Sequence, residues 1–433
     1  MRRAVRLNGE LLSINETSFD LTSRRSIYAV AIGKAAHAMA APLDELLGHR
    51  LTAGVLAGLS QDEPRAESLL AAPAASRLSK RWRVFAGGHP LPNEESLAAA
   101  RAAFDLLSRA EAERALVIFL ISGGGSATLE WPRDESVTLE ELREANRLLV
   151  HCGASIEEIN AVRRALSAVK GGRLAQCAPR AEQLTLIISD TNTGEEANVA
   201  SGPTLAPPLN APDAADVISR YELEKRLPAS ILRAVGQPSP VHGEQPPTAL
   251  RKDYVLLDNE DAISAASDAA RAQGFVVEVA NDIVEQEISA GCAQLLERLV
   301  AARRRAANTT RGVCLLSGGE FACPVRGAGL GGRNSETALR LALEVARQER
   351  RGMDSLSRFV ALSAGTDGID GNSPAAGALS DETTLRRAES KGLDAQGFLQ
   401  ASDAYAFFNA LGDVVVTGAT QTNVRDVRVL LAT

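Results

Sequence analysis

The chain has 433 residues, of which 45% are hydrophobic and 23% are charged, and its formal net charge at pH 7 is −7. This length exceeds that of one ordinary hydrophobic core, so the sequence predicts two globular domains. The acidic balance offers no basic face for nucleic acid, and no apolar run is long enough to span a bilayer. No signal-peptide core follows the first residues and the five cysteines are scattered, so we expect a cytoplasmic protein without a zinc site or disulfide framework.

The first core strand is expected at residues 28–32, and it leads through Gly33-Lys34 into a helix over 35–47. A lysine at such a junction can reach a phosphate bound at the helix N-terminus, although it is also a common residue at a solvated helix start. The junction does not have the spacing of a Walker A loop. A later Gly- and Pro-rich turn contains His89, which alone fits an ordinary turn residue.

The most informative stretch is 117–127, where five apolar residues run into Ser122-Gly123-Gly124-Gly125-Ser126. An unbroken apolar run indicates a strand buried on both faces, and the glycines allow a tight turn whose N–H groups point beyond the strand end. We expect an anion-binding loop here. Similar strand ends occur at 184–190, 314–320 and 359–368. Because open α/β folds bind ligands at the carboxyl ends of parallel strands, these ends predict a ligand site.

Charged residues follow several of these segments. Lys170 precedes Gly171-Gly172 at a predicted helix start, and Asp190 directly follows a strand. A carboxylate in that position can hold Mg²⁺ through water or accept a proton. Asp367 and Asp370 lie in a Gly-hinged loop whose spacing suits a cation, although Asp-Gly turns are also common without one.

Residues 236–248 are polar, rich in proline and without periodicity, which indicates a linker between domains at 1–240 and 241–433. The second domain contains G-x-G-x-x-G at 327–332, but Pro324 and Arg326 interrupt the strand that a dinucleotide fingerprint requires. We interpret this segment as a mobile clamp that brings Arg333 onto an anion. Together with the lysine and the strand-end aspartates, such a clamp favours phosphoryl transfer, which depends mainly on positioning and charge neutralisation.

The sequence resembles the type II glycerate kinases, which are glycerate 2-kinases whose C-terminal part is called the MOFRL domain. The resemblance extends over nearly the whole chain. It rests on these motifs, in order: Gly33-Lys34-Ala35-Ala36, Gly88-His89-Pro90, Ile121-Ser122-Gly123-Gly124-Gly125-Ser126-Ala127, Val169-Lys170-Gly171-Gly172-Arg173-Leu174-Ala175, Ser201-Gly202-Pro203-Thr204, Leu316-Ser317-Gly318-Gly319-Glu320, Gly331-Gly332-Arg333-Asn334, Ser363-Ala364-Gly365-Thr366-Asp367-Gly368-Ile369-Asp370-Gly371 and Thr422-Asn423-Val424.

The resemblance implies ATP- and Mg²⁺-dependent phosphorylation of D-glycerate, usually to 2-phosphoglycerate, by a monomer or homodimer. It also implies an α/β fold of two three-layer α/β/α domains with mainly parallel, Rossmann-like sheets and an active site in the interdomain cleft. The family's functional lysine, aspartate and arginine fall on Lys34, Asp190 and Arg333, which we expect to be catalytic. The remaining expected contacts are the substrate at Ser122, Gly123, Gly124, Gly125, Ser126 and Asn334, the nucleotide at Lys170, Gly171, Gly172, Gly202, Glu320 and Asp367, and Mg²⁺ at Asp190 and Asp367.

The sequence departs from the family pattern at three places. Thr193-Gly194-Glu195-Glu196 stands where the family usually has Gly-Asp-Asp-Pro, Ser373-Pro374 replaces a Thr-Asp pair, and most of an N-terminal helical segment is missing. Two alternatives stay open. One is an NAD(P)H-dependent hydroxypyruvate reductase, a label sometimes given to family members, and the other is a non-catalytic sensor that binds a nucleotide or a sugar acid.

Overall fold

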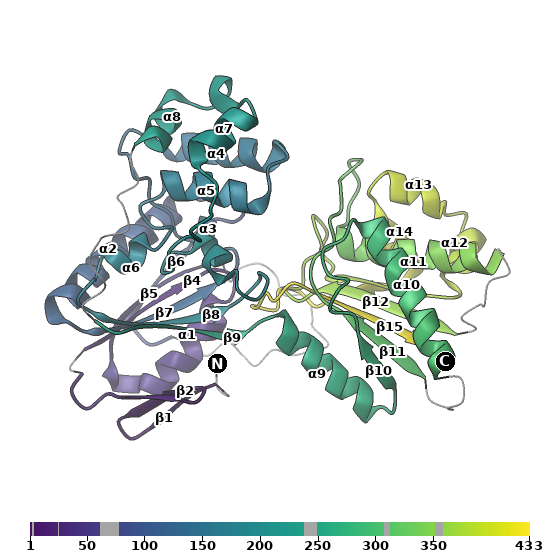
Figure 1. Cartoon of the computed structure of the whole chain (residues 1–433), viewed down its shortest axis with the longest axis horizontal. Coiled ribbons are helices and arrows are strands. Elements are labelled where there is room, and N and C mark those ends of the chain that lie inside the picture. The colour runs from purple at the N-terminus through teal and green to yellow at the C-terminus, as the bar shows by residue number, and fades with distance from the viewer. Residues whose placement is uncertain (2–3, 25, 61–77, 238–248, 307–311, 351–357) are drawn as a thin grey trace. The chain divides into compact units, whose positions relative to one another are not determined.

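The computed structural model describes all residues except 2–3, 25, 61–77, 238–248, 307–311 and 351–357. The described residues up to Leu256 form one compact unit and those from Leu257 onward form another (Figure 1), here called the N-terminal and C-terminal units. The predicted boundary after residue 240 and most of the predicted linker fall within 238–248, outside the described residues, whereas Gly236 ends a helix.

The N-terminal unit is built on a six-stranded sheet of order β6-β5-β4-β7-β8-β9. All four pairs among β4 to β8 are parallel. Every residue of β4 and β7 is buried, as their unbroken apolar runs predicted. The strands are β4 (Ile27–Ile32), β5 (Leu51–Gly58), β6 (Trp82–Ala86), β7 (Leu116–Ser122), β8 (Glu182–Ile188) and β9 (Arg251–Leu257).

Helices cover both faces of this sheet (Figure 1). The long helix α2 (Glu94–Glu113) shares a core with alternate residues of β4, and α1 (Ala36–Leu47) lies on the opposite face. A side-chain capping box fixes the start of α2, where Asn93 accepts a bond from the Ser96 N–H. The shorter elements are β1 (Val5–Asn8), β2 (Leu11–Ile14), β3 (Thr17–Asp20), η1 (Gly48–Arg50), α3 (Gly125–Thr128), α6 (Arg173–Gln176) and η2 (Glu196–Ser201).

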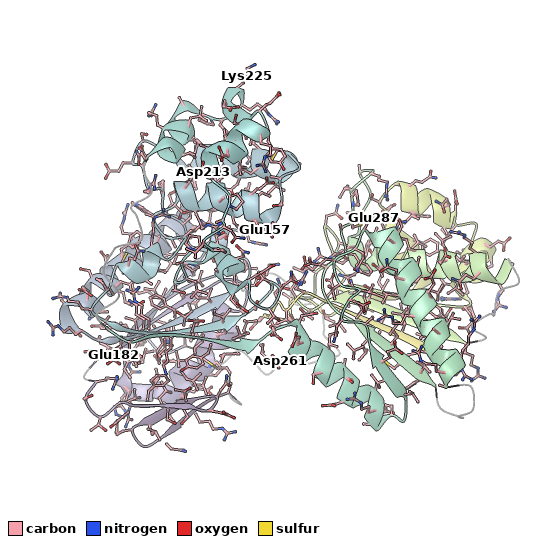
Figure 2. The ribbon with its side chains drawn as sticks, in the orientation of Figure 1. Glu157, Glu182, Asp213, Lys225, Asp261 and Glu287 are labelled. Carbon is pink, nitrogen blue, oxygen red and sulfur yellow. The ribbon has the colours of Figure 1, made fainter. Side chains whose placement is uncertain are left out.

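Four helices of the same unit form a subdomain with a hydrophobic core of its own. The side chains of Glu157 and Asp213 lie at the starts of two of these helices, and Lys225 follows the second (Figure 2). The helical subdomain consists of α4 (Leu139–His151), α5 (Ile156–Leu166), α7 (Ala214–Arg220) and α8 (Ala229–Gly236), with η3 (Leu223–Lys225) between the last two.

The C-terminal sheet has the order β10-β11-β15-β12-β13-β14, and it differs from the mainly parallel sheet that we expected. Among the described strands of this sheet, only β10 and β11 pair in parallel. The last strand, β15, inserts antiparallel between β11 and β12, and β13 is antiparallel to both β12 and β14. β11 and β12 nevertheless point the same way, so their polar ends still share an edge. The strands are β10 (Val276–Val279), β11 (Val313–Ser317), β12 (Phe359–Gly365), β13 (Gly377–Asp381), β14 (Val414–Val415) and β15 (Asp426–Ala432).

The faces of the C-terminal sheet are covered by different helices. α10 (Ile288–Arg305) and α11 (Arg333–Arg350) share a core with one face, and α9 (Asn259–Ala272) packs against the other. The remaining helices pack together beside α11 and β13. These are α12 (Thr384–Ser390), α13 (Ala395–Gln400) and α14 (Ala404–Leu411).

Candidate active site

The first group of predicted site residues lies at the carboxyl ends of three neighbouring strands of the N-terminal unit. Lys34 follows β4, Gly123 follows β7 and Asp190 follows β8, and these strands run parallel in register. The backbone N–H of Lys34 donates to the Gly123 carbonyl at 2.9 Å, which ties the first two strand ends together. Lys34 and Asp190 are both partly exposed, so a ligand can reach them. We call this group the strand-end cluster.

Ser122 holds the strand-end cluster together from inside. Its hydroxyl donates to the Ile32 carbonyl at 3.1 Å and accepts from the Ala35 N–H at 3.0 Å. The neighbouring Gly33 has φ +106°, and a Cβ there would lie 2.4 Å from the Ser122 carbonyl oxygen, so only glycine fits. The buried Ser122 hydroxyl therefore positions the loop, and this use argues against its predicted contact with substrate.

Gly124 places two basic side chains next to each other. It has φ +79°, and a Cβ there would lie 2.9 Å from Cγ of Lys34 and 3.4 Å from Nδ1 of His89. His89 comes from the loop after β6, and its ring is exposed. His89 is not among the site residues predicted from the sequence, although its position in a rigid Gly-Pro turn was the available signal. The structure adds it to the strand-end cluster.

Ser126 connects this loop to a second segment of unusual backbone. Its hydroxyl lies 2.7 Å from the hydroxyl of Ser201, which itself donates to the side-chain oxygen of Asn160 at 2.8 Å. Ala200 and Ser201 both have positive φ, at +52° and +61°, a conformation that costs non-glycine residues free energy. The contacts made by Ser126 and Asn160 hold Ser201 in place.

The predicted nucleotide loop at Lys170 is largely occupied by internal contacts. The N–H groups of Gly171 and Gly172 donate to the carbonyls of Ser201 and Gly202 at 3.1 and 2.7 Å. The ammonium of Lys170 pairs with the buried carboxylate of Glu130, and burial lowers the pKa of Lys170. Because the lysine is itself 1% exposed, this pair is structural. The arrangement argues against the predicted nucleotide contacts of Lys170, Gly171 and Gly172.

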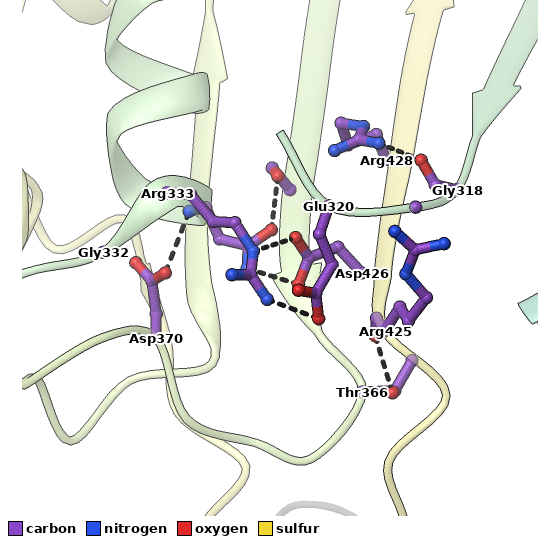
Figure 3. A network of polar contacts seen from close by, with 12 residues as sticks. Gly318, Glu320, Gly332, Arg333, Thr366, Asp370, Arg425, Asp426 and Arg428 are labelled. Atoms are coloured by element: carbon purple, nitrogen blue, oxygen red, sulfur yellow. Dashed lines mark hydrogen bonds and ion pairs between the residues drawn. The ribbon is translucent and has the colours of Figure 1, made fainter. Parts of the chain in front are cut away.

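In the C-terminal unit, Arg333 begins α11 and is held by two carboxylates (Figure 3). Its Nη2 lies 2.6 Å from Glu320, and its Nε lies 2.6 Å from Asp426. Burial lowers the pKa of Arg333, but Asp426 and Glu320 outweigh it, so the pKa lies above the usual range. Asn334 donates to Asp426 at 2.9 Å, so two of the predicted site residues share one buried carboxylate. The guanidinium is therefore rigidly oriented before any ligand binds.

Asp370 serves as the cap of α11 rather than as an open cation ligand. Its carboxylate accepts bonds from the N–H groups of Asn334 and Ser335 at 2.9 and 2.8 Å and from the Ser335 hydroxyl at 2.6 Å. Burial raises the pKa of Asp370 in spite of these bonds. Asp367, three residues earlier, is partly exposed and accepts from the Ile369 N–H at 3.1 Å.

The glycine-rich segment 327–332 was expected to be a mobile clamp, but hydrogen bonds fix it on two sides. The N–H of Leu330 donates to Asp403 and the N–H of Gly331 donates to Asn372, each at 2.8 Å. A Cβ on Gly332 would lie 2.3 Å from Asp370, so this glycine permits close packing. Residues 318–332 are all described and contain no strand beyond an isolated bridge at Ala322, so the requirement of a dinucleotide fingerprint is not met.

In the part of the chain that the structure describes, no group of three or more His, Cys, Asp or Glu side chains could hold a metal ion. Among the same residues, no helix has the length and apolar character needed to cross a membrane.

Comparison with known proteins then places the chain. Residues 1–236 match a domain of unknown function, DUF4147, and residues 313–426 match the MOFRL family. The chain is 34% identical to human glycerate kinase, over 99% of this chain and 89% of that protein. It belongs to the type II glycerate kinase family. The D-glycerate 2-kinase of Thermotoga maritima is 31% identical over 96% of this chain and 92% of that protein.

The fold agrees with that membership. A crystal structure of glycerate kinase from Thermotoga maritima matches with a TM-score of 0.77 and 30% identity, over 95% of this chain and 92% of that chain. The same family includes relatives with another name. A protein of Agrobacterium vitis called a putative hydroxypyruvate reductase is 36% identical over 81% of this chain and 77% of its own length.

Proposed function

We propose that this member of the type II glycerate kinase family transfers the terminal phosphoryl group of ATP to D-glycerate. The observation that carries the proposal is the strand-end cluster, which presents Lys34 and Asp190 at one sheet edge in a chain similar to glycerate kinases over nearly its full length. Phosphoryl transfer needs positive charge near the phosphate and a group that orients the attacking hydroxyl.

In the N-terminal unit, each of the three side chains of the cluster has a different role in the reaction. The ammonium of Lys34 neutralises negative charge on the transferring phosphoryl group or on the glycerate carboxylate. The carboxylate of Asp190 accepts the proton of the attacking hydroxyl. His89, which lies beside Lys34 at Gly124, donates a further hydrogen bond to the anionic substrate.

The residues present also suit Mg²⁺, which kinases commonly receive together with ATP. Mg²⁺ is usually held by one or two carboxylates plus the phosphates of the substrate, rather than by a cage made only of protein groups. Asp190 and Asp367 each provide one partly exposed carboxylate of this kind. When bound, the ion neutralises charge on the phosphates.

Arg333 is the expected cationic residue of the C-terminal unit. Glu320 and Asp426 occupy two nitrogen atoms of its guanidinium, so an anion can pair with that side only after Glu320 moves away. Glu320 is one-third exposed, at 33%, whereas Asp426 is buried at 2%, so Glu320 is the partner that a ligand can displace. We therefore propose that Arg333 exchanges Glu320 for an anionic group of a substrate.

We assign the 2-hydroxyl as the acceptor and 2-phosphoglycerate as the product. The support is the name of the Thermotoga maritima relative, a D-glycerate 2-kinase. We further propose that the enzyme acts in the cytoplasm, because all five cysteines are free thiols, as is usual in reducing compartments.

The deciding experiment measures ADP release from the purified protein with ATP, Mg²⁺ and D-glycerate, followed by ³¹P NMR of the product. Glycerate-dependent ADP release would support the kinase, and the phosphorus–proton coupling pattern would identify the phosphorylated hydroxyl. A parallel reaction with hydroxypyruvate and NADH tests the activity named for the Agrobacterium vitis relative. Consumption of NADH without ADP release would overturn the proposal, as would the absence of both signals.

A further inference from the structure

A cavity of about 400 Å³ lies in the N-terminal unit, between the helical subdomain and the Gly171–Arg173 loop. Its size is within the range of small-molecule sites, roughly 300–1,000 Å³. None of the strand-end residues lines it, so it is separate from the site described above. Figure 2 shows Asp213, one of its lining residues, at the start of α7.

Three arginines line this cavity, namely Arg133, Arg164 and Arg173. Burial lowers the pKa of Arg133 and of Arg164. Burial also lowers the pKa of Arg173, to about 10, and the positive charges of Arg133 and Arg164 lower it further. The three guanidinium groups are therefore near enough to repel one another inside a partly desolvated space.

The arginines that line the cavity outnumber its acidic lining residues. Neither Arg133 nor Arg164 forms an ion pair with any residue that the structure describes, although Arg164 is only 5% exposed. Asp134 attracts Arg133 from a greater distance, and Arg164 donates to the side-chain oxygen of Asn198 at 3.4 Å. Arg133 donates through Nη2 to two backbone carbonyls, while its Nε and Nη1 are buried without a hydrogen-bond partner. The carboxylate of Asp213 also lines the cavity, but it accepts bonds from the first N–H groups of α7. Cations that are removed from water and bonded only to neutral groups are costly, so an anion in the cavity would be stabilised.

The chemistry of the lining defines the missing anion. Planar guanidinium groups bind phosphate through paired hydrogen bonds, and three of them match its double charge better than that of a single carboxylate. Much of the remaining wall is alanine, proline and valine, which suits the uncharged body of a small molecule. We propose that this cavity binds the phosphate group of a small phosphorylated molecule. The inference does not rest on the proposed kinase activity.

The cavity is linked to the strand-end cluster through the backbone. Gly171, which lines the cavity, donates to the Ser201 carbonyl, and the Ser201 hydroxyl contacts Ser126 in the loop after β7. A molecule bound in the cavity would therefore contact Gly171, which is hydrogen-bonded to Ser201, and Ser201 in turn contacts the loop after β7.

Binding is tested on the full chain by titration calorimetry and thermal unfolding, with inorganic phosphate, pyrophosphate and Mg²⁺-free ATP as probes at constant ionic strength. Pyrophosphate should raise the melting temperature, because a ligand that binds only the folded state stabilises it. Arg164→Met should weaken pyrophosphate binding at least tenfold and remove the rise. Arg226→Met, which removes an exposed arginine outside the cavity, should behave like the unaltered protein. If Arg164→Met does not fold, Arg133→Gln replaces it.

The probes separate the sources of the phosphate. Calorimetry counts the bound equivalents, because ATP also binds at the proposed kinase site. Loss of one equivalent of each probe in the Arg164 variant shows that the cavity recognises the phosphoryl group itself, and loss of one equivalent of pyrophosphate and ATP but not of inorganic phosphate shows that it needs two linked phosphates. Pyrophosphate binding that is absent from the unaltered protein, or whose stoichiometry and affinity are unchanged in both cavity variants, would overturn the proposal. Glycerate is not present, so failure here leaves the kinase assay untouched, and an inactive kinase leaves this test intact.

Discussion

Lys34 is the strand-end residue whose charge the proposed reaction uses most directly. Lys34→Met should lower kcat/KM for glycerate phosphorylation by about 10²- to 10³-fold, the usual effect of removing one group that stabilises transition-state charge. The melting temperature should change little, since the side chain is partly exposed. Steady-state kinetics and thermal unfolding check both statements. Lys225→Met, which removes an exposed lysine from η3, is the control, and equal activity of the two variants would contradict the assignment.

Arg333 is expected to matter for stability as well as for turnover. Arg333→Ala leaves the buried carboxylate of Asp426 without its cation, which should lower the free energy of unfolding by about 2–3 kcal/mol; this is less than the roughly 3–5 kcal/mol of a fully buried pair because the arginine is one-third exposed. Urea unfolding measures the loss. Adding Asp426→Asn should restore part of it, and a double variant that is less stable than Arg333→Ala would contradict the pairing.

The titration of Asp370 should make the free energy of unfolding depend on pH, and the direction of that dependence can be worked out. Burial raises its pKa in the folded state above the ordinary 3.8, so between these two values the folded chain binds more protons than the unfolded chain. The contribution of Asp370 to the free energy of unfolding therefore falls as the pH rises between these two pKa values. Asp370→Asn removes the titration. The stability of the unaltered protein minus that of the variant, from urea unfolding at several pH values upward from pH 4, should decrease with pH, and an increase would contradict the argument.

At the scale of elements, the meeting of the loops after β4, β6 and β7 depends on Gly124. Gly124→Ala imposes left-handed strain and places a methyl group 2.9 Å from Cγ of Lys34, which must move away. Gly153→Ala imposes similar strain, because φ is +87° at Gly153 and +79° at Gly124. At position 153, however, no atom lies within 4 Å of the added Cβ. Both variants should lose about 1 kcal/mol of stability. Only Gly124→Ala should also lose activity, by about tenfold or more, and equal kinetics would show that the loop does not position Lys34.

The strand ends were predictable because, in α/β proteins, a long apolar run followed by Gly and Ser usually indicates a buried strand that ends in a tight loop. β4, β7, β8, β11 and β12 all form where the sequence placed them. The antiparallel pairing of strands in the C-terminal sheet was not predictable. It depends on β15, which inserts between two strands that lie far from it in the chain. Distant partners explain the other differences too. Lys170 looked like a phosphate ligand until the fold brought Glu130, forty residues earlier, to its ammonium.

The described residues of each unit form hydrophobic cores of their own. The residues expected to take part in catalysis are also divided between the two units. Lys34, His89 and Asp190 belong to the N-terminal unit, and Arg333, Glu320 and Asp367 belong to the C-terminal unit. A change that weakens the packing of one unit therefore need not disturb the residues of the other.

This division predicts that calorimetric unfolding shows two transitions, one for each unit. Lys170→Met removes the cation that is bonded to the buried carboxylate of Glu130 and leaves it only the attraction of Arg163, which should lower the N-terminal transition by about 10 °C, given the roughly 3–5 kcal/mol cost of breaking a buried pair. Arg333→Ala should lower only the other transition. One transition that both variants shift equally would mean that the units unfold as a single cooperative body, and stability effects in one could then no longer be separated from activity effects in the other.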